Sequence, residues 1–494
     1  MQRTALGAVI GIAAMFGLAA LLALPRSSAG QQAATQLPPS LEDAINPIVA
    51  DCNVTPDVDT QKPPKATPIT PTLIASGQPC AEIVTTQGLT KDELINLQRG
   101  FDFYSWLTFM ALNSPADGAG IGKSAKGSDP MTKWESLENY RQLADIMLAN
   151  GSRPVWGTPV VPPECYSEYK SGMMIVKVIE ESFNQPFKSG PLIDQNGHYA
   201  LFDILTNKPM FDYIVEHGLY SRAGQRAFSD RVVFPSGINF EKKGQATPGR
   251  MGAVMLKVSW KILSDNDNPH KFHTVQALVD VPNFSDPDDR PTCRRVTLGL
   301  VGFHVGHKTQ KRPQWIWTTF EHVDNAPEQR DIDSKHELRA HYNFYNPACS
   351  MIECPTNQTP PRPWGLNSSL RFHSPFRSQV VRTTSLFPGA RELNQAFQSI
   401  LAGTVWENYM LVSTQWPSDS TCAGSKDPTH EIDQTCAPAP TYLANTTLET
   451  YSQQGIDGQT PLATSSCMAC HGNATTQHNG TGPSDFTFIL EKAH

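Results

Sequence analysis

The sequence lacks several features that would assign it to a common functional class. Its 40 lysine and arginine residues are outnumbered by 47 aspartate and glutamate residues, so it has no basic excess of the kind that binds nucleic acid, and we expect no nucleic-acid partner. No G-x-S-x-G, H-E-x-x-H, Walker or dinucleotide-binding pattern occurs, which removes the usual hydrolase, metalloprotease and nucleotide signatures. There is no internal repeat either. The chain therefore has to be classified from its termini, its cysteines and its hydrophobic pattern.

No stretch beyond the first residues is apolar enough to cross a bilayer. At the N-terminus, Arg3 precedes an uncharged apolar run over residues 5 to 24, and small residues follow at Ser27 and Ala29. This order predicts a signal peptide over residues 1–29, cleaved after Ala29. The run is also just long enough to span a membrane, so an uncleaved N-terminal anchor is the alternative and the one membrane contact that we expect. Both alternatives predict a periplasmic or secreted protein.

The cysteine count agrees with export. Setting aside Cys467 and Cys470, eight of the ten cysteines remain, an even number that suits an oxidising compartment. Cys349 with Cys354 and Cys422 with Cys436 are the pairs that would close short loops, although eight cysteines allow many other pairings. The spacings do not match a zinc site of two C-x-x-C pairs.

The chain divides into four regions by composition. After the signal peptide, residues 30–89 form a proline-rich extension, which Cys52 and Cys80 could anchor. Residues 90–460 are predicted to form one large domain, and residues 461–494 a short C-terminal segment. The 40 prolines argue against a helical bundle.

The large domain is predicted to be an α+β fold, a β-rich mixed domain with peripheral helices. A capping box at Thr90 to Glu93 predicts a helix, and its apolar positions are Leu94, Leu97, Phe101, Tyr104 and Leu107. Further helices are predicted over 133–149 and 391–401. Alternating apolar residues or β formers predict strands over 252–263, 272–281, 296–305, 314–323 and 404–416, with a turn over 308–313.

One motif near the C-terminus carries chemistry. Residues 467 to 471 read Cys-Met-Ala-Cys-His, and C-x-x-C-H is the attachment signature of c-type haem. Two thiols one helical turn apart can add to the two vinyl groups of a porphyrin, and the adjacent histidine then lies beneath the iron. A thioredoxin-like dithiol is the competing interpretation, but too few residues follow to build its βαβ setting. We therefore predict one covalent haem c, with Cys467 and Cys470 as attachment residues and His471 as the iron ligand.

The motif resembles the haem-attachment site of c-type cytochromes over those few residues. The rest of the chain is similar to large secreted bacterial proteins of the cytochrome c family, through the segments GLVGFHVGHKT (299–309), QWIWTTFEHVDN (314–325) and LANTTLETYSQ (443–453). This resemblance implies no particular substrate. Small soluble cytochromes usually place a methionine ligand downstream of the motif, whereas residues 472–494 contain no methionine. The haem is therefore expected to pack against the upstream region.

The sixth iron ligand is expected from that upstream region. His304 is the first candidate, because glycines around it would permit the approach of a flat macrocycle. His307 lies three residues on and should point to the opposite face of the strand. The other candidates are His322, Met410, His478 and His494. For each histidine the competing interpretation is a hydrogen-bonded core residue.

Two further groups have competing interpretations. The aromatic stretch of residues 315–320 is expected to be core rather than a cofactor wall. Glu321, His322 and Asp324 resemble an acid/base cluster, but neighbours on a strand face opposite ways.

Three functions remain open at this stage. The first is one-electron transfer to a redox partner protein or a small-molecule donor or acceptor. The second is a haem-dependent oxidoreductase, or a peroxide- or gas-binding protein, with an open sixth position. The third is a large domain with a site of its own that uses the haem as an electron outlet.

Overall fold

The computed structural model describes residues 91–116, 130–170, 173–177, 180–236, 251–281, 292–309, 312–334, 338–367, 369–417, 438–453, 465–477 and 482–494. All of these belong to one compact unit of the chain. The helices are α3 (Lys91–Leu112), α4 (Glu180–Phe183), α5 (Lys208–Glu216), α6 (Arg222–Ala227), α7 (Gln329–Asp333), α8 (Pro388–Ile400) and α9 (Cys467–His471). The strands are β1 (Tyr140–Gln142), β2 (Met174–Lys177), β3 (Leu201–Asn207), β4 (Val254–Ile262), β5 (Thr274–Val281), β6 (Thr292–Thr309), β7 (Arg312–His322), β8 (Tyr409–Pro417) and β9 (Pro438–Ala439).

Within the described residues, the strands form one large, mostly antiparallel sheet. Its order is β1-β3-β4-β6-β7-β8-β9, and β5 pairs with both β6 and β2. The long strand β6 joins the two parts, because residues 292–299 pair with β5 and residues 298–307 pair with β4. The α+β, β-rich fold class predicted from the sequence is therefore confirmed.

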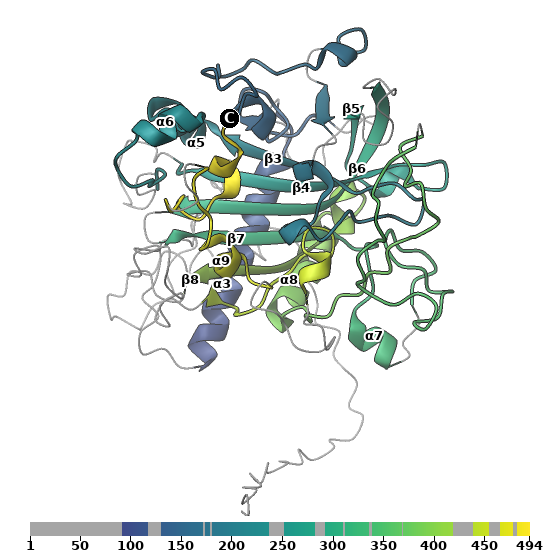
Figure 1. Ribbon diagram of the computed structural model, residues 1–494. Coiled ribbons are helices and arrows are strands. Elements are labelled where there is room, and N and C mark those ends of the chain that lie inside the picture. The colour runs from purple at the N-terminus through teal and green to yellow at the C-terminus, as the bar shows by residue number, and fades with distance from the viewer. Residues whose placement is uncertain are drawn as a thin grey trace, which may run out of the picture. The chain divides into compact units, whose positions relative to one another are not determined.

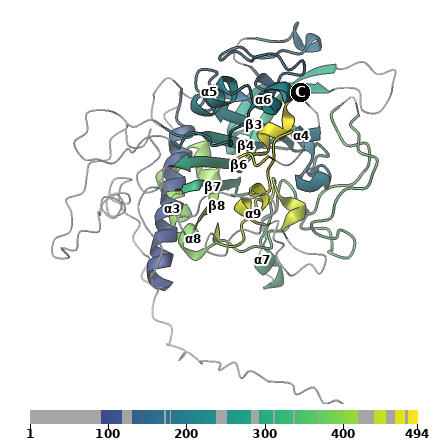
Figure 2. The same cartoon turned by 60° about the vertical axis from the view of Figure 1, so that its left-hand side comes forward.

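The two faces of the sheet carry different layers. Helices α3 and α8 pack on one face, which we call the helix face, and α9 packs on the other, against β7 and β8. Figures 1 and 2 show this arrangement, with the yellow C-terminal residues across the sheet from α3. We call this second surface the C-terminal face, because residues 443–453, 465–477 and 482–494 cover it. The C-terminal residue ends beside α6, where the Arg222 amide donates to the His494 carbonyl at 3.0 Å.

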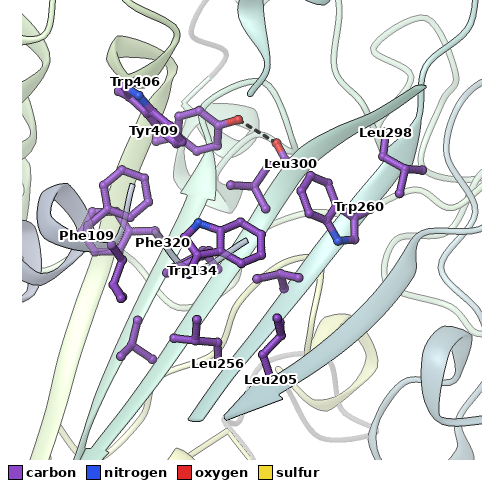
Figure 3. Packing of buried hydrophobic residues seen from close by; sticks show 14 of the residues in the cluster. Phe109, Trp134, Leu205, Leu256, Trp260, Leu298, Leu300, Phe320, Trp406 and Tyr409 are labelled. Carbon is purple, nitrogen blue, oxygen red and sulfur yellow. Dashed lines mark hydrogen bonds between the residues drawn. The ribbon is translucent and has the colours of Figure 1, made fainter. Parts of the chain in front are cut away.

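The helix face holds the main hydrophobic core. Trp106 of α3 lies parallel to Phe397 of α8, with ring centroids 4.7 Å apart, and Phe109 stacks on Phe320 of β7 at 4.2 Å. Figure 3 shows Phe109, Phe320 and Trp406 in this layer, and the Tyr409 hydroxyl donating to the Leu300 carbonyl at 3.0 Å. Burial of such large aromatic surfaces is the main source of stability for the sheet.

Several sequence predictions agree with these bounds, and two differ. The predicted helix from residue 90 is α3, the helix over 391–401 is α8, and the strands over 252–323 are β4 to β7. The helix predicted over 133–149 is wrong: Tyr140–Gln142 pairs antiparallel with β3 instead, and Trp134 inserts between Trp260 and Phe303. The strand predicted from residue 404 begins only at Tyr409, after a 3-10 turn over Val405–Asn408.

Two disulfides occur among the described residues. Cys349–Cys354 is one of the short-loop pairs predicted from the sequence, whereas Cys165–Cys293 was not anticipated. Cys52, Cys80, Cys422 and Cys436 lie outside the described residues. Disulfides fit an exported protein. In the described part of the chain, no helix combines the length and apolarity needed to cross a membrane.

Candidate functional site

Helix α9 presents the two thiols of the C-x-x-C-H motif on a single helical turn. Its N-cap is Ser466, whose hydroxyl accepts from the Ala469 amide at 3.3 Å. Gln415 of β8 also holds this end of the helix, because its side-chain oxygen accepts from the Met468 amide at 2.8 Å. Cys467 and Cys470 are both free and half-buried. The helix thus begins at a fixed point on the sheet.

The imidazole of His471 is held by three groups. Its Nδ1 lies 2.9 Å from the Phe486 carbonyl, and the rings of Trp317 and Phe488 lie 4.3 and 5.2 Å from its own. A carbonyl can only accept, so Nδ1 carries the proton and the lone pair is on Nε2. Nε2 has no hydrogen-bond partner among the residues that the structure describes. The ring is therefore in the tautomer that ligates a metal through Nε2.

The carbonyl that orients His471 belongs to a strained segment. Asp485 and Phe486 both have positive φ, at 51° and 65°, a conformation that costs side-chain-bearing residues about 1–2 kcal/mol each. The Asp485 carboxylate forms a buried ion pair with Lys308 of β6, and its carbonyl accepts from the Trp315 indole at 3.0 Å. These contacts hold the strained conformation. Strain maintained in this way is typical of functional sites.

The side chains of Glu449, His304 and Lys257 lie near α9 on the C-terminal face. Glu449 accepts from His304 Nε2 at 2.9 and 3.0 Å, and Lys257 of β4 is paired in register with His304 of β6. Burial alone would raise the pKa of Glu449, but His304 and Lys257 together hold it below its usual value. Burial lowers the pKa of Lys257, and the nearby Glu449 carboxylate partly offsets this shift. Glu449 is therefore held in its ionised form beside the motif, next to Lys257.

The motif residues are neutral near pH 7. Burial raises the pKa of Cys470 to about 11, with Glu449 adding to the effect, and it also raises the pKa of Cys467 well above its usual value. Burial also lowers the pKa of His471 to about 4. A redox-active dithiol needs a depressed thiol pKa, so this pair is poorly suited to thiol–disulfide exchange. A neutral imidazole is the form that binds iron.

No three His, Cys, Asp or Glu side chains in the described part of the chain come together in a way that could hold a metal ion. The protein residues near α9 therefore do not form a complete coordination sphere for a bare ion. Haem needs less from the protein, because the porphyrin nitrogens supply the equatorial ligands and the protein only the axial ones.

Residues 443–453 bind the sheet between the motif and β6. The side-chain nitrogen of Asn445 donates to Thr319 Oγ1 and to the Phe320 carbonyl, each at 2.9 Å. Thr446 donates through its amide to Glu321 at 2.6 Å, and Glu321 also forms a buried ion pair with Arg382. Gly302 lets the segment lie close, since a Cβ there would be 2.2 Å from Thr447 Oγ1. This docking holds Glu449 opposite His304.

The structure separates two of the predicted ligand candidates. His304 lies on the C-terminal face, whereas His307 is buried on the helix face with its Nδ1 against the Tyr104 hydroxyl. They face opposite ways, as their spacing predicts. His307 therefore cannot bind the same iron as His471. The prediction that glycines near His304 leave space for a macrocycle is wrong for two of them. The space at Gly302 is filled by Thr447, and Gly299 packs against Phe272.

Three other candidates also have defined positions. His322 is fully buried, and its ring bonds the Lys271 carbonyl at 2.9 Å and the Asp324 amide at 3.1 Å, which makes it a core histidine. Met410 packs on the same small hydrophobic cluster as Cys467. His494 is exposed beside α6, while His478 lies outside the described residues.

The remaining sequence interpretations can be placed as well. Trp315 and Trp317 are buried, as expected for core residues. Trp317 also contacts His471, so this strand additionally lines the candidate site. Glu321 and Asp324 bind different partners, Arg382 and Lys271, and form no acid/base cluster with His322. Sequence reasoning missed Glu449 and Phe486. No local pattern identifies either residue. The Glu449 carboxylate reaches His304 from a segment distant in sequence, and Phe486 acts through its backbone carbonyl.

Comparisons of this chain with protein-family models, with curated proteins and with solved structures gave no match.

Proposed function

We propose that the protein is an exported c-type cytochrome that carries one haem on Cys467, Cys470 and His471 and transfers single electrons. The observation that carries this proposal is the state of His471 at the end of α9. Its Nδ1 donates to a backbone carbonyl, and no described residue bonds its Nε2. The ring comes directly after two free thiols. This combination suits haem attachment better than it suits a dithiol or a bare metal site.

Bound haem would supply reversible one-electron chemistry at iron. The residues of this chain would fix its position and electronics. Gln415 and Ser466 set the start of α9, Phe486 sets the tautomer and orientation of His471, and Trp317 packs against its ring. Glu449 and Lys257 place charges of opposite sign near the site.

The proposed location is the periplasm or the extracellular space, with a redox partner protein or a small-molecule donor or acceptor as partner. The disulfides support an oxidising compartment. Membrane attachment would come only through an uncleaved N-terminal run.

A second function has an observation in its favour. His304, the first candidate for the sixth ligand, already bonds a carboxylate through Nε2, so it could ligate iron only through Nδ1 or by leaving Glu449. An open sixth position would then make the protein a haem-dependent oxidoreductase or a peroxide- or gas-binding protein. Met410, which packs on the same cluster as Cys467, is the alternative sixth ligand.

The visible spectrum of the purified protein distinguishes the two functions. For electron transfer we expect a sharp low-spin reduced spectrum that carbon monoxide leaves unchanged, because both axial positions are filled. A shift with carbon monoxide would indicate an open or weakly held position and would favour the second function. His304→Ala and Met410→Leu then form a matched pair of variants: the one that turns the spectrum high-spin identifies the sixth ligand, and the other is its control.

A further inference from the structure

The ring of His471 is the first member of a series of aromatic contacts that leads away from α9. Trp317 lies 4.3 Å from it, and Trp315, two residues back on the same face of β7, lies 6.3 Å from Trp317. Both indoles are buried, with exposed fractions of 0% and 6% for Trp315 and Trp317. Each indole nitrogen donates to a carbonyl, of Asp485 at 3.0 Å and of Gln314 at 2.9 Å. The two rings are thus fixed in place.

The series continues to the surface at α5. Phe234 lies 6.1 Å from Trp315, and Tyr213 of α5 lies 4.9 Å from Phe234. Tyr213 is half-buried and contacts the exposed His217 at 4.4 Å. Trp317, Trp315 and Phe234 belong to the hydrophobic cluster that also contains Met468 of α9, and Tyr213 packs on it. The contacts therefore run without a gap from the motif to the end of α5.

We infer that Trp317, Trp315, Phe234 and Tyr213 form an electron route between the haem-bound His471 and the α5 surface. This inference rests on the proposed function. In such a route, one electron leaves ferrous iron, which becomes ferric, and a one-electron acceptor at α5 is reduced; the reverse direction serves a donor. No bond is formed or broken. Indole and phenol rings are the protein groups that lose a single electron most readily, and Phe234 bridges the gap between them.

No other series of ring contacts among the described residues starts at His471. Phe488, its second ring neighbour at 5.2 Å, has no further ring contact there. The aromatic layer around Trp106 and Phe109 lies on the helix face, across the sheet from His471. A redox partner docking at α5 would therefore reach the haem through aromatic side chains.

Aromatic clusters also exist simply to fill cores, so the test must measure electron transfer and not stability. The exposed Glu216, at the end of α5, is changed to cysteine in the haem-loaded protein and labelled with a ruthenium polypyridyl complex. Light excites the ruthenium label, which then gives one electron to a small-molecule acceptor in solution and is left oxidised by one electron. The label then takes one electron from ferrous iron, and the rate is followed from the haem absorbance.

We expect Trp315→Phe and Trp317→Phe to slow this rate severalfold each, since phenylalanine fills similar space but is much harder to oxidise. The matched control is Trp156→Phe, because Trp156 contacts Phe211 of α5 at 5.0 Å and lies outside the series. It should leave the rate unchanged. Trp315 does not touch His471, although its indole bonds the Asp485 carbonyl in the segment that orients His471. The haem spectrum and reduction potential of Trp315→Phe are therefore measured alongside, and its rate is compared with that of the parent protein at equal driving force.

Two results would overturn the route and are distinguishable. If haem is bound and both tryptophan variants transfer electrons as fast as Trp156→Phe, the route is wrong while the proposed function stands. If the unsubstituted protein shows no covalent haem on a denaturing gel, the proposed function fails and the route with it. Should Trp317→Phe bind haem poorly, Trp315→Phe alone decides the outcome.

Discussion

The helix face and the C-terminal face of the same sheet are built from different kinds of residue. On the helix face, strands β4 to β8 contribute Leu256, Phe303, Phe320 and Leu411 to a continuous aromatic and aliphatic core. On the C-terminal face, the same strands contribute Lys257, His304, Thr319 and Glu321, which bind residues of the C-terminal segments or lie near the motif. Strand alternation alone produces this division, because neighbouring residues point to opposite faces.

The difference separates stability from chemistry. The helix face gains most of its stability from buried apolar area, whose contribution is non-directional and roughly proportional to the area removed from water. The C-terminal face depends on directed hydrogen bonds and ion pairs, which place His471, Glu449 and the motif at defined positions. Variants that act on one face and leave the other intact therefore test this comparison.

The largest effect is expected for Trp106→Ala on the helix face. Trp106 has no exposed surface, stacks on Phe397 and contacts Phe320 edge-on, so truncation should reduce the free energy of unfolding by about 3–5 kcal/mol. Denaturant-induced unfolding measures this. The control is Trp364→Ala, because Trp364 is only partly buried; its loss should be clearly smaller. Equal losses for the two variants would contradict the account of the helix face.

The next largest effect is expected for Arg382→Met on the C-terminal face. Arg382 and Glu321 are a fully buried ion pair, so removal of the arginine leaves a buried carboxylate unpaired, at a cost of about 3–4 kcal/mol in the free energy of unfolding. The matched control is Arg391→Met, because the pair of Arg391 with Glu328 is partly exposed and should contribute under about 1 kcal/mol. Unfolding in denaturant compares the two. If Arg382→Met were as stable as Arg391→Met, residues 443–453 would not depend on this pair.

Asp102 provides a pH test on the helix face. Burial raises the pKa of Asp102 to about 7 against four opposing hydrogen bonds, and its Oδ2 has no hydrogen-bond partner within the described part of the chain. A carboxyl group whose pKa is raised by folding stabilises the protein fully below its unfolded pKa, and this stability is lost as pH rises toward 7. Asp102→Asn should remove this loss and be more stable than the parent protein at pH 8, by on the order of 2 kcal/mol.

Unfolding curves at pH 5 and pH 8 check this prediction. The two proteins should differ mainly at pH 8. A parent protein whose stability does not fall between these pH values, relative to Asp102→Asn, would show that Asp102 is ionised at both.

The smallest effect is expected for Gly302→Ala. A Cβ at Gly302 would meet Thr447 Oγ1 at 2.2 Å, so docking of residues 443–453 should weaken by about 1–2 kcal/mol. Gly389→Ala is the control, because a Cβ there meets only Phe387 at 3.8 Å in helix α8, where alanine is favoured over glycine. Hydrogen exchange of the residue 445–447 amides should increase in Gly302→Ala only. Unchanged exchange would show that this close approach is dispensable.

Much of the sheet could be predicted from the sequence because its strands follow simple alternation. Val254, Leu256 and Val258 of β4 all have low exposure, as their spacing indicates. The helix predicted over 133–149 failed because tertiary contacts outweighed local periodicity: Trp134 is committed to Asn113 and Trp260. Short strands such as β1, with three residues, have too little pattern to be recognised.

The C-x-x-C-H motif can be read directly from the sequence, whereas the residues that surround it in the structure cannot. Cys467, Cys470 and His471 form a contiguous signal, whereas Phe486, Trp317 and Glu449 approach His471 or its neighbours only after folding. Their roles depend on a carbonyl direction, a ring contact and a charge brought from another segment. None of these leaves a pattern along the chain.

The most direct test of the central claim is the mass of the denatured protein after expression with the cytochrome c maturation machinery. The account predicts that one haem remains attached under denaturing conditions, and that replacing both Cys467 and Cys470 with alanine removes it. A parent protein that shows only the mass of its polypeptide would contradict haem attachment at this motif, and with it the proposed function.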